Sequence, residues 1–239
     1  MKYIKILAII FFDLIDKYIH QKHIILFFKK KVEKIECMID VGCHKGTYSD
    51  LFINNFNLKI VLMFEPQRAI FSFLKKKYRN FQNVKLFNNA VSNNNKSKKI
   101  YINRHDLTSS LKKLDENNSY IKQKKKLFIK KKNQSIISTS YLVKCVTLTE
   151  ILKKFRLNKV DLLKIDTEGY EYEVLNGIGK NIKKINYILI EFHNDKIYSG
   201  YNPLKIHKFL EDHNFFLKKI LKFPFTAWED RIYKNKNFK

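Results

Sequence analysis

Three carboxylates surround a glycine in residues 162–177, which read LLKIDTEGYEYEVLNG. The segment begins with branched apolar residues typical of a buried strand, and a helical pattern follows the acidic turn. In open α/β sheets, ligands bind in the crevice outside the carboxyl ends of the strands. The sequence therefore predicts that Asp166 and Glu168 lie in a ligand-binding crevice rather than in bulk solvent.

A second polar pair, Glu191 and His193, ends the apolar stretch 185–192. Residues two apart on a strand share a face, and this strand should neighbour the one that ends at Asp166. We therefore predict that Asp166, Glu168, Glu191 and His193 converge as a catalytic group. His193, whose unperturbed pKa is about 6.5, is the best single candidate for a general base. The alternative for His193 is a polar residue that caps the turn at the end of the strand.

The same side chains could instead hold a metal ion. Carboxylate oxygens suit Mg²⁺ or Mn²⁺, and an imidazole can join them. The candidate ligands are Asp166, Glu191 and His193.

A glycine turn lies near the start of the chain, where residues 40–46 read DVGCHKG. The dinucleotide fingerprint GxGxxG fails here, because Asp40 stands two before Gly42 and His44 stands two after it. An acid at that position suits a ligand with a cationic amino group better than a pyrophosphate. Glu65, about 20 residues on, could accept hydrogen bonds from both hydroxyls of a ribose. Alternatives are a turn-forming role for Asp40 and a helix-start role for Glu65.

Strand and helix patterns alternate along most of the chain. We expect strands at 37–43, 59–65, 83–92, 143–147, 160–165, 185–192, 215–222 and 225–233, and helices at 46–55, 67–79, 148–156, 171–177 and 203–213. This alternation predicts an α/β fold, with a mostly parallel sheet and helices on both faces.

Two regions fall outside the alternation. Residues 1–34 are expected to form an N-terminal helical extension, and a Lys-rich insertion at 112–133 interrupts the domain at 35–239. The apolar stretch 3–12 is shorter than the ~20 residues that span a bilayer, and no small-residue cleavage site follows it. Apolar residues recur there at intervals of three and four residues, as on one face of a helix. We therefore favour an amphipathic helix packed on the domain over one lying on a membrane surface.

The formal net charge is +26, yet only five of the 48 basic residues are Arg. Because Arg is the residue that binds phosphate bidentately, this composition favours a solvated Lys-rich surface over a nucleic-acid partner. An anionic acceptor or a membrane surface that binds the Lys-rich segments is the alternative. The three cysteines have neither metal-binding nor paired spacing. We expect a cytoplasmic protein, with attachment to the periphery of a membrane as the alternative.

Six short motifs occur in order between residues 37 and 193: DVGxxxGxY at 40–48, FEP at 64–66, NxAVS at 88–92, TSSL at 108–111, IDTEGYE at 165–171 and IEFH at 190–193. Together they resemble the FkbM family of S-adenosylmethionine-dependent methyltransferases. The resemblance implies a Rossmann-like class I methyltransferase fold with a seven-stranded central sheet. It also implies a cofactor site, whose expected members are Asp40, Gly42, His44, Gly46, Glu65, Asn89 and Ala90, the last two near the adenine.

The resemblance further implies O-methylation of a saccharide or glycan hydroxyl. Such a hydroxyl is a poor nucleophile, so it needs a general base or a metal ion. Alternatives are an RNA methyltransferase, and a non-catalytic basic domain that binds an anionic polymer or membrane. The sequence departs from the family pattern at Cys43 and His44, where the family has Ala-Asn, and at Thr149, where it has Asp.

Overall fold

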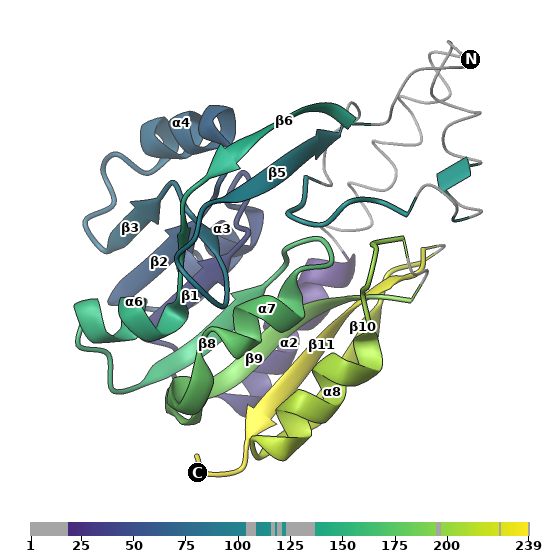
Figure 1. Cartoon of the computed structure of the whole chain (residues 1–239). Helices are drawn as coiled ribbons and strands as arrows, with labels where there is room; N and C mark the ends of the chain where they lie inside the picture. Colours follow the sequence, from purple (N-terminus) through teal and green to yellow (C-terminus); the bar gives the residue numbers. More distant parts are fainter. Residues whose placement is uncertain are drawn as a thin grey trace.

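Seven strands form the central sheet, in the order β10-β11-β9-β8-β1-β2-β3 (Figure 1). The computed structural model describes residues 19–103, 109–115, 118, 121–122, 137–194, 197–224 and 226–238. Four neighbouring pairs are parallel, and β11 runs antiparallel to both β9 and β10. The strands are β1 (Cys37–Val41), β2 (Ile60–Phe64), β3 (Val84–Phe87), β8 (Val160–Ile165), β9 (Ile185–His193), β10 (Phe215–Lys222) and β11 (Trp228–Asn235). The predicted seven-stranded, mostly parallel sheet is confirmed.

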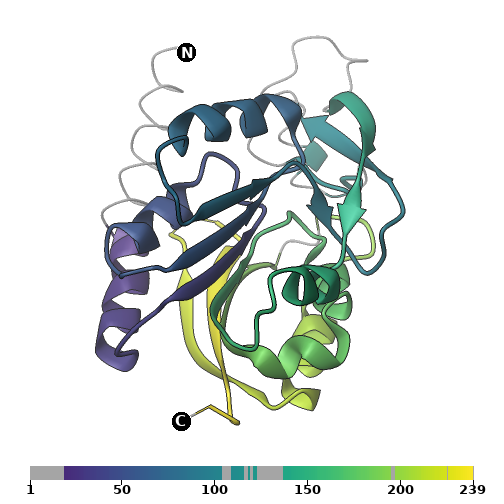
Figure 2. The ribbon, with the colours of Figure 1, turned by 90° about the vertical axis from the view of Figure 1, so that its left-hand side faces the viewer.

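Helices cover both faces of the sheet, as predicted (Figure 2). On one face lie α2 (Gln21–Lys31), α3 (Thr47–Ile53) and α4 (Arg68–Lys77), and on the other lie α6 (Leu148–Lys154), α7 (Glu171–Asn176) and α8 (Pro203–Asp212). Side chains alternate between these two cores along each strand, since successive strand residues point to opposite faces. In β1, for example, Met38 packs with α2 and α3, whereas Ile39 packs with α6 and α7.

Two predicted strands are wrong in their extent. The predicted strand 83–92 divides into β3 and the short β4 (Ala90–Val91), because the side chain of Asn88 turns the chain by donating to the backbone oxygens of Glu65 and Pro66. The predicted strand 143–147 is likewise divided, and its part β7 (Cys145–Val146) pairs with β4 outside the central sheet.

A two-stranded antiparallel sheet, which the sequence did not reveal, flanks the Lys-rich insertion. It consists of β5 (Lys98–Asn103) and β6 (Ile137–Val143). Most of the insertion at 112–133 lies outside the described residues, so its predicted surface position stays a prediction.

The helix α2 packs on the sheet rather than standing apart from it. Ile24 and Phe28 are fully buried, and the ring of Phe28 contacts those of Phe52 and Tyr187. The part of the predicted extension that precedes residue 19 lies outside the described residues. Among the helices that the structure describes, none has the length and apolar character needed to cross a membrane.

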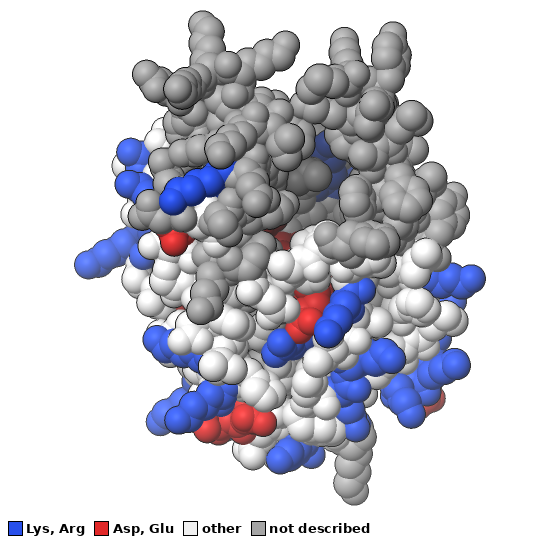
Figure 3. Space-filling model, turned by 90° about the vertical axis from the view of Figure 1, so that its right-hand side faces the viewer, with Lys and Arg blue, Asp and Glu red and all other residues white. Residues whose placement is uncertain are grey.

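Basic side chains are spread over the surface that Figure 3 shows. On that face the Lys and Arg side chains are scattered among uncharged ones, and they do not gather into one patch within the described part. That the Lys-rich surface is only solvated stays a prediction.

Candidate active site

A cavity of about 530 Å³ lies at the carboxyl ends of the central parallel strands. Its lining includes the turn after β1, the turn after β2, the acidic turn after β8 and Glu191 on β9. Three of the predicted catalytic residues, Asp166, Glu168 and Glu191, line it. The structure thus brings polar side chains from neighbouring strands together at the edge where ligands bind in open α/β sheets.

The glycine turn after β1 crosses the acidic turn after β8 at close range. Gly42 has a φ of 77°, and a Cβ placed on it would lie 1.8 Å from the backbone oxygen of Asp166. Gly42 and His44 line the cavity. Gly46, with a φ of 79°, instead packs under the hydroxyl of Tyr78 and is not among the described residues that line the cavity. The role of Gly46 is therefore to shape the turn.

Glu65 is held by the backbone at the end of β2. Its Oε2 accepts from the backbone N–H of His44 at 3.0 Å, and its Oε1 accepts from that of Gln67 at 2.7 Å. Burial raises the pKa of Glu65 to about 7, although the two N–H groups act to lower it. Asn89 and Ala90 line the same cavity. Each carboxylate oxygen keeps a lone pair for a further donor, because an oxygen can accept about two hydrogen bonds.

Asp40 lies behind the cavity rather than in its lining. The side chain is fully buried, and its Oδ2 accepts from the hydroxyl of Ser49 at 2.6 Å. Its Oδ1 lies 3.7 Å from Nζ of Lys164, a residue that does line the cavity. Asp40 takes this position because its carboxylate is directed toward Ser49 of α3 and Lys164 of β8, whereas the next residue, Val41, lines the cavity. In this position the side chain of Asp40 does not reach the cavity, so it is not placed to contact a cofactor there directly.

Lys164 is a site residue that the sequence reasoning missed. It lies on β8 with its side chain 3% exposed, its Nζ 3.0 Å from Oδ2 of Asp166 and 4.6 Å from the ring centre of Tyr48. Burial acts to lower the pKa of Lys164, but Asp166 and Asp40 outweigh it and raise that pKa. The attraction is mutual, since Lys164 holds the pKa of Asp166 below its usual value in spite of burial. A lysine inside a buried strand, between Leu163 and Ile165, was the available indication.

The backbone conformation of the acidic turn orients the side chain of Glu168. Glu168 and Gly169 both have positive φ, 55° and 91°. Glu171, the third carboxylate of the motif, closes the turn: its Oε1 accepts from the backbone N–H groups of Thr167 and Gly169 and from the hydroxyl of Thr167. Glu171 is therefore a structural residue, and Glu168 is the one that faces the cavity.

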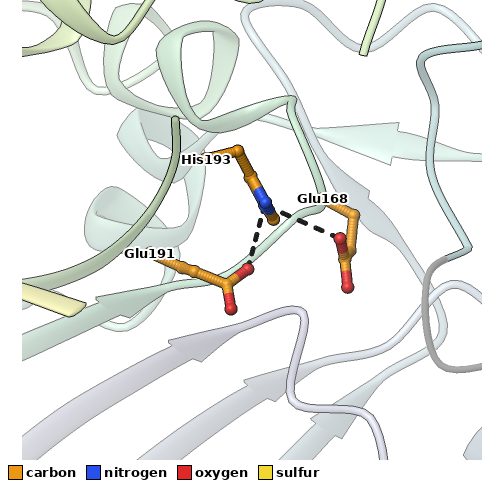
Figure 4. Close-up of side chains that lie close together, drawn as sticks. All are labelled: Glu168, Glu191 and His193. Carbon is orange, nitrogen blue, oxygen red and sulfur yellow. Dashed lines mark ion pairs between the residues drawn. The ribbon is translucent and has the colours of Figure 1, made fainter. Parts of the chain in front are cut away.

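Glu168, Glu191 and His193 form a compact cluster (Figure 4). His193 Nε2 lies 3.0 Å from Oε2 of Glu191 and 3.6 Å from Oε2 of Glu168. The hydroxyl of Tyr198 donates to Glu168, and the His193 ring packs edge-on against Tyr198 and Tyr201. Burial, and then the mutual repulsion of the two carboxylates, raises the pKa of Glu168 well above its usual value. Burial, followed by repulsion from Asp166, does the same to the pKa of Glu191.

The predicted convergence of four residues therefore takes a different form. Asp166 pairs with Lys164 and shares a side-chain hydrogen bond with Glu191, whereas Glu168 and Glu191 are the carboxylates paired with His193. His193 is 4% exposed and is absent from the described residues that line the cavity. It lies behind the two glutamates.

Comparisons with known proteins agree with this architecture. A hexuronic acid methyltransferase, AglP of Haloferax volcanii, is 27% identical over 73 residues, which is 30% of this chain and 28% of AglP. The crystal structure of Methyltransferase FkbM from Methylobacillus flagellatus KT matches 84% of this chain and 43% of its own, with 15% identity and a TM-score of 0.51. The chain thus spans less than half the length of either relative.

A third likeness concerns the fold alone. The alignment with the structure of M. capricolum TrmK in complex with S-adenosyl-homocysteine covers 90% of this chain and 68% of the TrmK chain, with 10% identity and a TM-score of 0.50.

The model of the family described as Methyltransferase FkbM domain matches residues 40–217, which is more than half of the chain. The chain therefore belongs to the FkbM methyltransferase family.

Proposed function

We propose that this protein is an S-adenosylmethionine-dependent methyltransferase that methylates a hydroxyl oxygen of a saccharide. Membership of the FkbM family supports methyl transfer. The observation that carries the proposal is one cavity lined both by Glu65, at the end of β2, and by the carboxylates Glu168 and Glu191, from β8 and β9. Glu65 suits the binding of a cofactor, and the two carboxylates Glu168 and Glu191 suit an acceptor that must lose a proton.

The residues around Glu65 fit the cofactor. A buried carboxylate with a lone pair to spare on each oxygen matches the two hydroxyls of a ribose, and the backbone N–H groups of His44 and Gln67 fix its orientation. Asn89 and Ala90 would approach the adenine, and Gly42 and His44 would flank the remainder. When bound, S-adenosylmethionine supplies a methyl group on a positively charged sulfur. The protein's own task is to hold the acceptor oxygen in line with that methyl group.

The residues around Glu191 fit the acceptor. A saccharide hydroxyl must lose its proton as the new bond forms, and a nearby base promotes that loss. Glu168 and Glu191 line the cavity, so we assign contact with the hydroxyl to them. His193 lies behind them, with its Nε2 3.0 Å from Oε2 of Glu191 and 3.6 Å from Oε2 of Glu168. The saccharide class rests on AglP, whose name describes a hexuronic acid methyltransferase.

Two measurements test the proposal. Calorimetric titration with S-adenosylhomocysteine should show binding, and absence of binding would contradict the cofactor assignment. Transfer of a radiolabelled methyl group should then be measured with hexuronic acids, neutral saccharides and total RNA as acceptors. Label in the saccharides is expected. Label in RNA alone would overturn the acceptor class and would favour an RNA methyltransferase.

A further inference from the structure

Two buried atoms of the acceptor cluster face each other without forming a hydrogen bond. Nε2 of His193 and Oε2 of Glu191 are 3.0 Å apart, yet neither has a hydrogen-bond partner within the part of the chain that the structure describes. The His193 side chain is 5% exposed. Buried polar atoms in folded proteins nearly always have a hydrogen-bond partner, and a third group that binds both atoms would satisfy the two together.

Two of the separations within the cluster are close to those between donor atoms around a single metal ion. Donor atoms bound to a divalent ion at about 2.0–2.2 Å lie roughly 3–3.5 Å from one another. The distances from Nε2 of His193 to the two glutamate oxygens are 3.0 and 3.6 Å, and all three donor atoms lie within 4.8 Å of one another. Figure 4 shows the three side chains, one from the acidic turn and two from β9, directed toward a common point.

The charges around the cluster also leave room for a cation. Lys164 lies between Asp40 and Asp166, which share its charge. Asp230, the register partner of Glu191 on β11, is 2.8 Å from Nε2 of His20. Among the described groups, His193 is the basic side chain paired with Glu168 and Glu191, and a side-chain hydrogen bond joins Glu191 to Asp166. A divalent ion would balance both carboxylates and let a neutral imidazole act as a ligand.

The surrounding residues hold the three donors in place, as the outer shell of a metal site does. The hydroxyl of Tyr198 donates to Glu168, and the rings of Tyr198 and Tyr201 flank His193. The hydroxyl of Ser110 donates to the backbone oxygen of Glu168 at 2.6 Å, which ties down the turn that carries this carboxylate.

We propose that Glu168, Glu191 and His193 bind one divalent cation of the Mn²⁺ class. Two carboxylate oxygens and one imidazole nitrogen suit Mn²⁺ better than Mg²⁺, which prefers oxygen ligands throughout. Both glutamates line the cavity, so the ion would meet an acceptor there and would lower the pKa of its hydroxyl. That role rests on the proposed function, whereas binding of the ion does not.

Titration of the full chain with MnCl₂ after removal of metals by a chelator tests the proposal. The loss of the free Mn²⁺ signal in electron paramagnetic resonance should show about one ion bound per chain. His193→Gln and Glu191→Gln should each weaken binding at least tenfold. His207→Gln is the matched control, because His207 pairs with Glu211 at 3.4 Å on the surface, and it should bind Mn²⁺ as the unaltered protein does.

Absence of Mn²⁺ binding up to millimolar concentration would overturn the proposal, as would equal binding by all the variants. Circular dichroism shows whether the variants on β9 fold. If the variants on β9 do not fold, the Glu168→Gln variant, whose substitution lies in the turn after β8, should show the same weakening of Mn²⁺ binding. Titration of the same samples with S-adenosylhomocysteine separates the two proposals. If the protein binds Mn²⁺ but not S-adenosylhomocysteine, the metal site stands and the cofactor assignment fails. If it binds S-adenosylhomocysteine but not Mn²⁺, the cofactor assignment stands and the metal site fails.

Discussion

Lys164 donates a hydrogen bond to Asp166, two positions along the chain, with Nζ 3.0 Å from Oδ2. The same Nζ lies 3.7 Å from Oδ1 of Asp40, the residue that faces Lys164 in the register of β1 and β8. One buried cation therefore links the first strand to the acidic turn beneath the cavity. Each of the three side chains stabilises the charged form of its neighbours, because an unpaired charge is costly in a buried position.

Replacement of this cation tests how far the sheet depends on it. Lys164→Met should lower the free energy of unfolding by about 3–5 kcal/mol, the scale for breaking a buried ion pair by removing one partner. Urea unfolding measures the change. Lys59→Met is the control, since Lys59 pairs with Glu36 at 2.9 Å while their side chains are 70% and 33% exposed, and surface pairs contribute about 0–1 kcal/mol. Equal effects of the two substitutions would contradict the assignment.

Gly169 should resist replacement more strongly than a glycine with a similar backbone elsewhere. Its φ is 91°, and a Cβ would lie 2.4 Å from Cγ of Tyr198. Gly200 has a φ of 68°, and a Cβ placed on it would meet no described atom within 4 Å. Gly200→Ala should therefore cost about 1 kcal/mol from backbone strain alone, and Gly169→Ala should cost more because Tyr198 must also move. Thermal unfolding of the two variants checks the difference, and a smaller cost at Gly169 would refute it.

Glu65 should contribute directly to cofactor affinity. Glu65→Ala removes a carboxylate that accepts from two backbone N–H groups and keeps lone pairs for a ligand. Loss of a hydrogen bond to a charged group costs about 1.5–3 kcal/mol, so the dissociation constant for S-adenosylhomocysteine should rise roughly tenfold or more. Calorimetry measures it, with Glu211→Ala as a surface control. An unchanged dissociation constant in Glu65→Ala would remove Glu65 from the cofactor site.

The raised pKa of Glu65 also predicts a pH dependence of stability. Its pKa is about 7 in the folded protein against a usual 4.5, so the folded state binds this proton more tightly than the unfolded state. Raising the pH from about 4.5 to 7 should therefore remove stability, on the order of 3 kcal/mol, and above pH 7 the loss is complete. Glu65→Gln should lack this loss. If the free energies of unfolding of the two proteins run parallel between about pH 5 and 8, the pKa of Glu65 is not raised.

The positions of the main strands in the chain and their mostly parallel arrangement were predictable from the sequence, for a physical reason. Strands such as β8 and β9 are buried on both faces, so their sequences are rich in branched apolar residues. The division between β3 and β4 was not predictable, because it depends on hydrogen bonds from Asn88 to backbone oxygens more than 20 residues away in the chain. Pairing of β5 with β6 depends likewise on contacts across the Lys-rich insertion.

Strand alternation placed Glu191 and His193 on one face, and the structure agrees. The exchange of roles between Asp166 and Glu168 could not be read from spacing. It follows from the positive φ of Glu168, which turns that side chain toward His193, and from Lys164, which holds Asp166. Asp40 was placed in the cofactor site by its motif position, whereas its burial against Ser49 depends on the packing of α3.

The acceptor cluster should control turnover and leave cofactor affinity unchanged. Glu168 and Glu191 reach the cavity from the acidic turn and from β9, whereas Glu65 is held by the turns after β1 and β2. Loss of either acceptor-side carboxylate should therefore not disturb cofactor binding. Glu191→Gln keeps the size of the side chain and should lower kcat by ~10² to 10⁴, the range for loss of a general base.

The Asp166→Asn variant separates the role of this cluster from that of the neighbouring Lys164–Asp166 pair. Asp166 binds Lys164, so its loss should act mainly on stability, with a smaller effect on kcat than Glu191→Gln. Steady-state kinetics with a verified saccharide acceptor, together with S-adenosylhomocysteine titration of each variant, decides the matter. Turnover near that of the unaltered protein in Glu191→Gln would show that the acceptor proton leaves by another route, and a raised dissociation constant for S-adenosylhomocysteine would place Glu191 in the cofactor site instead.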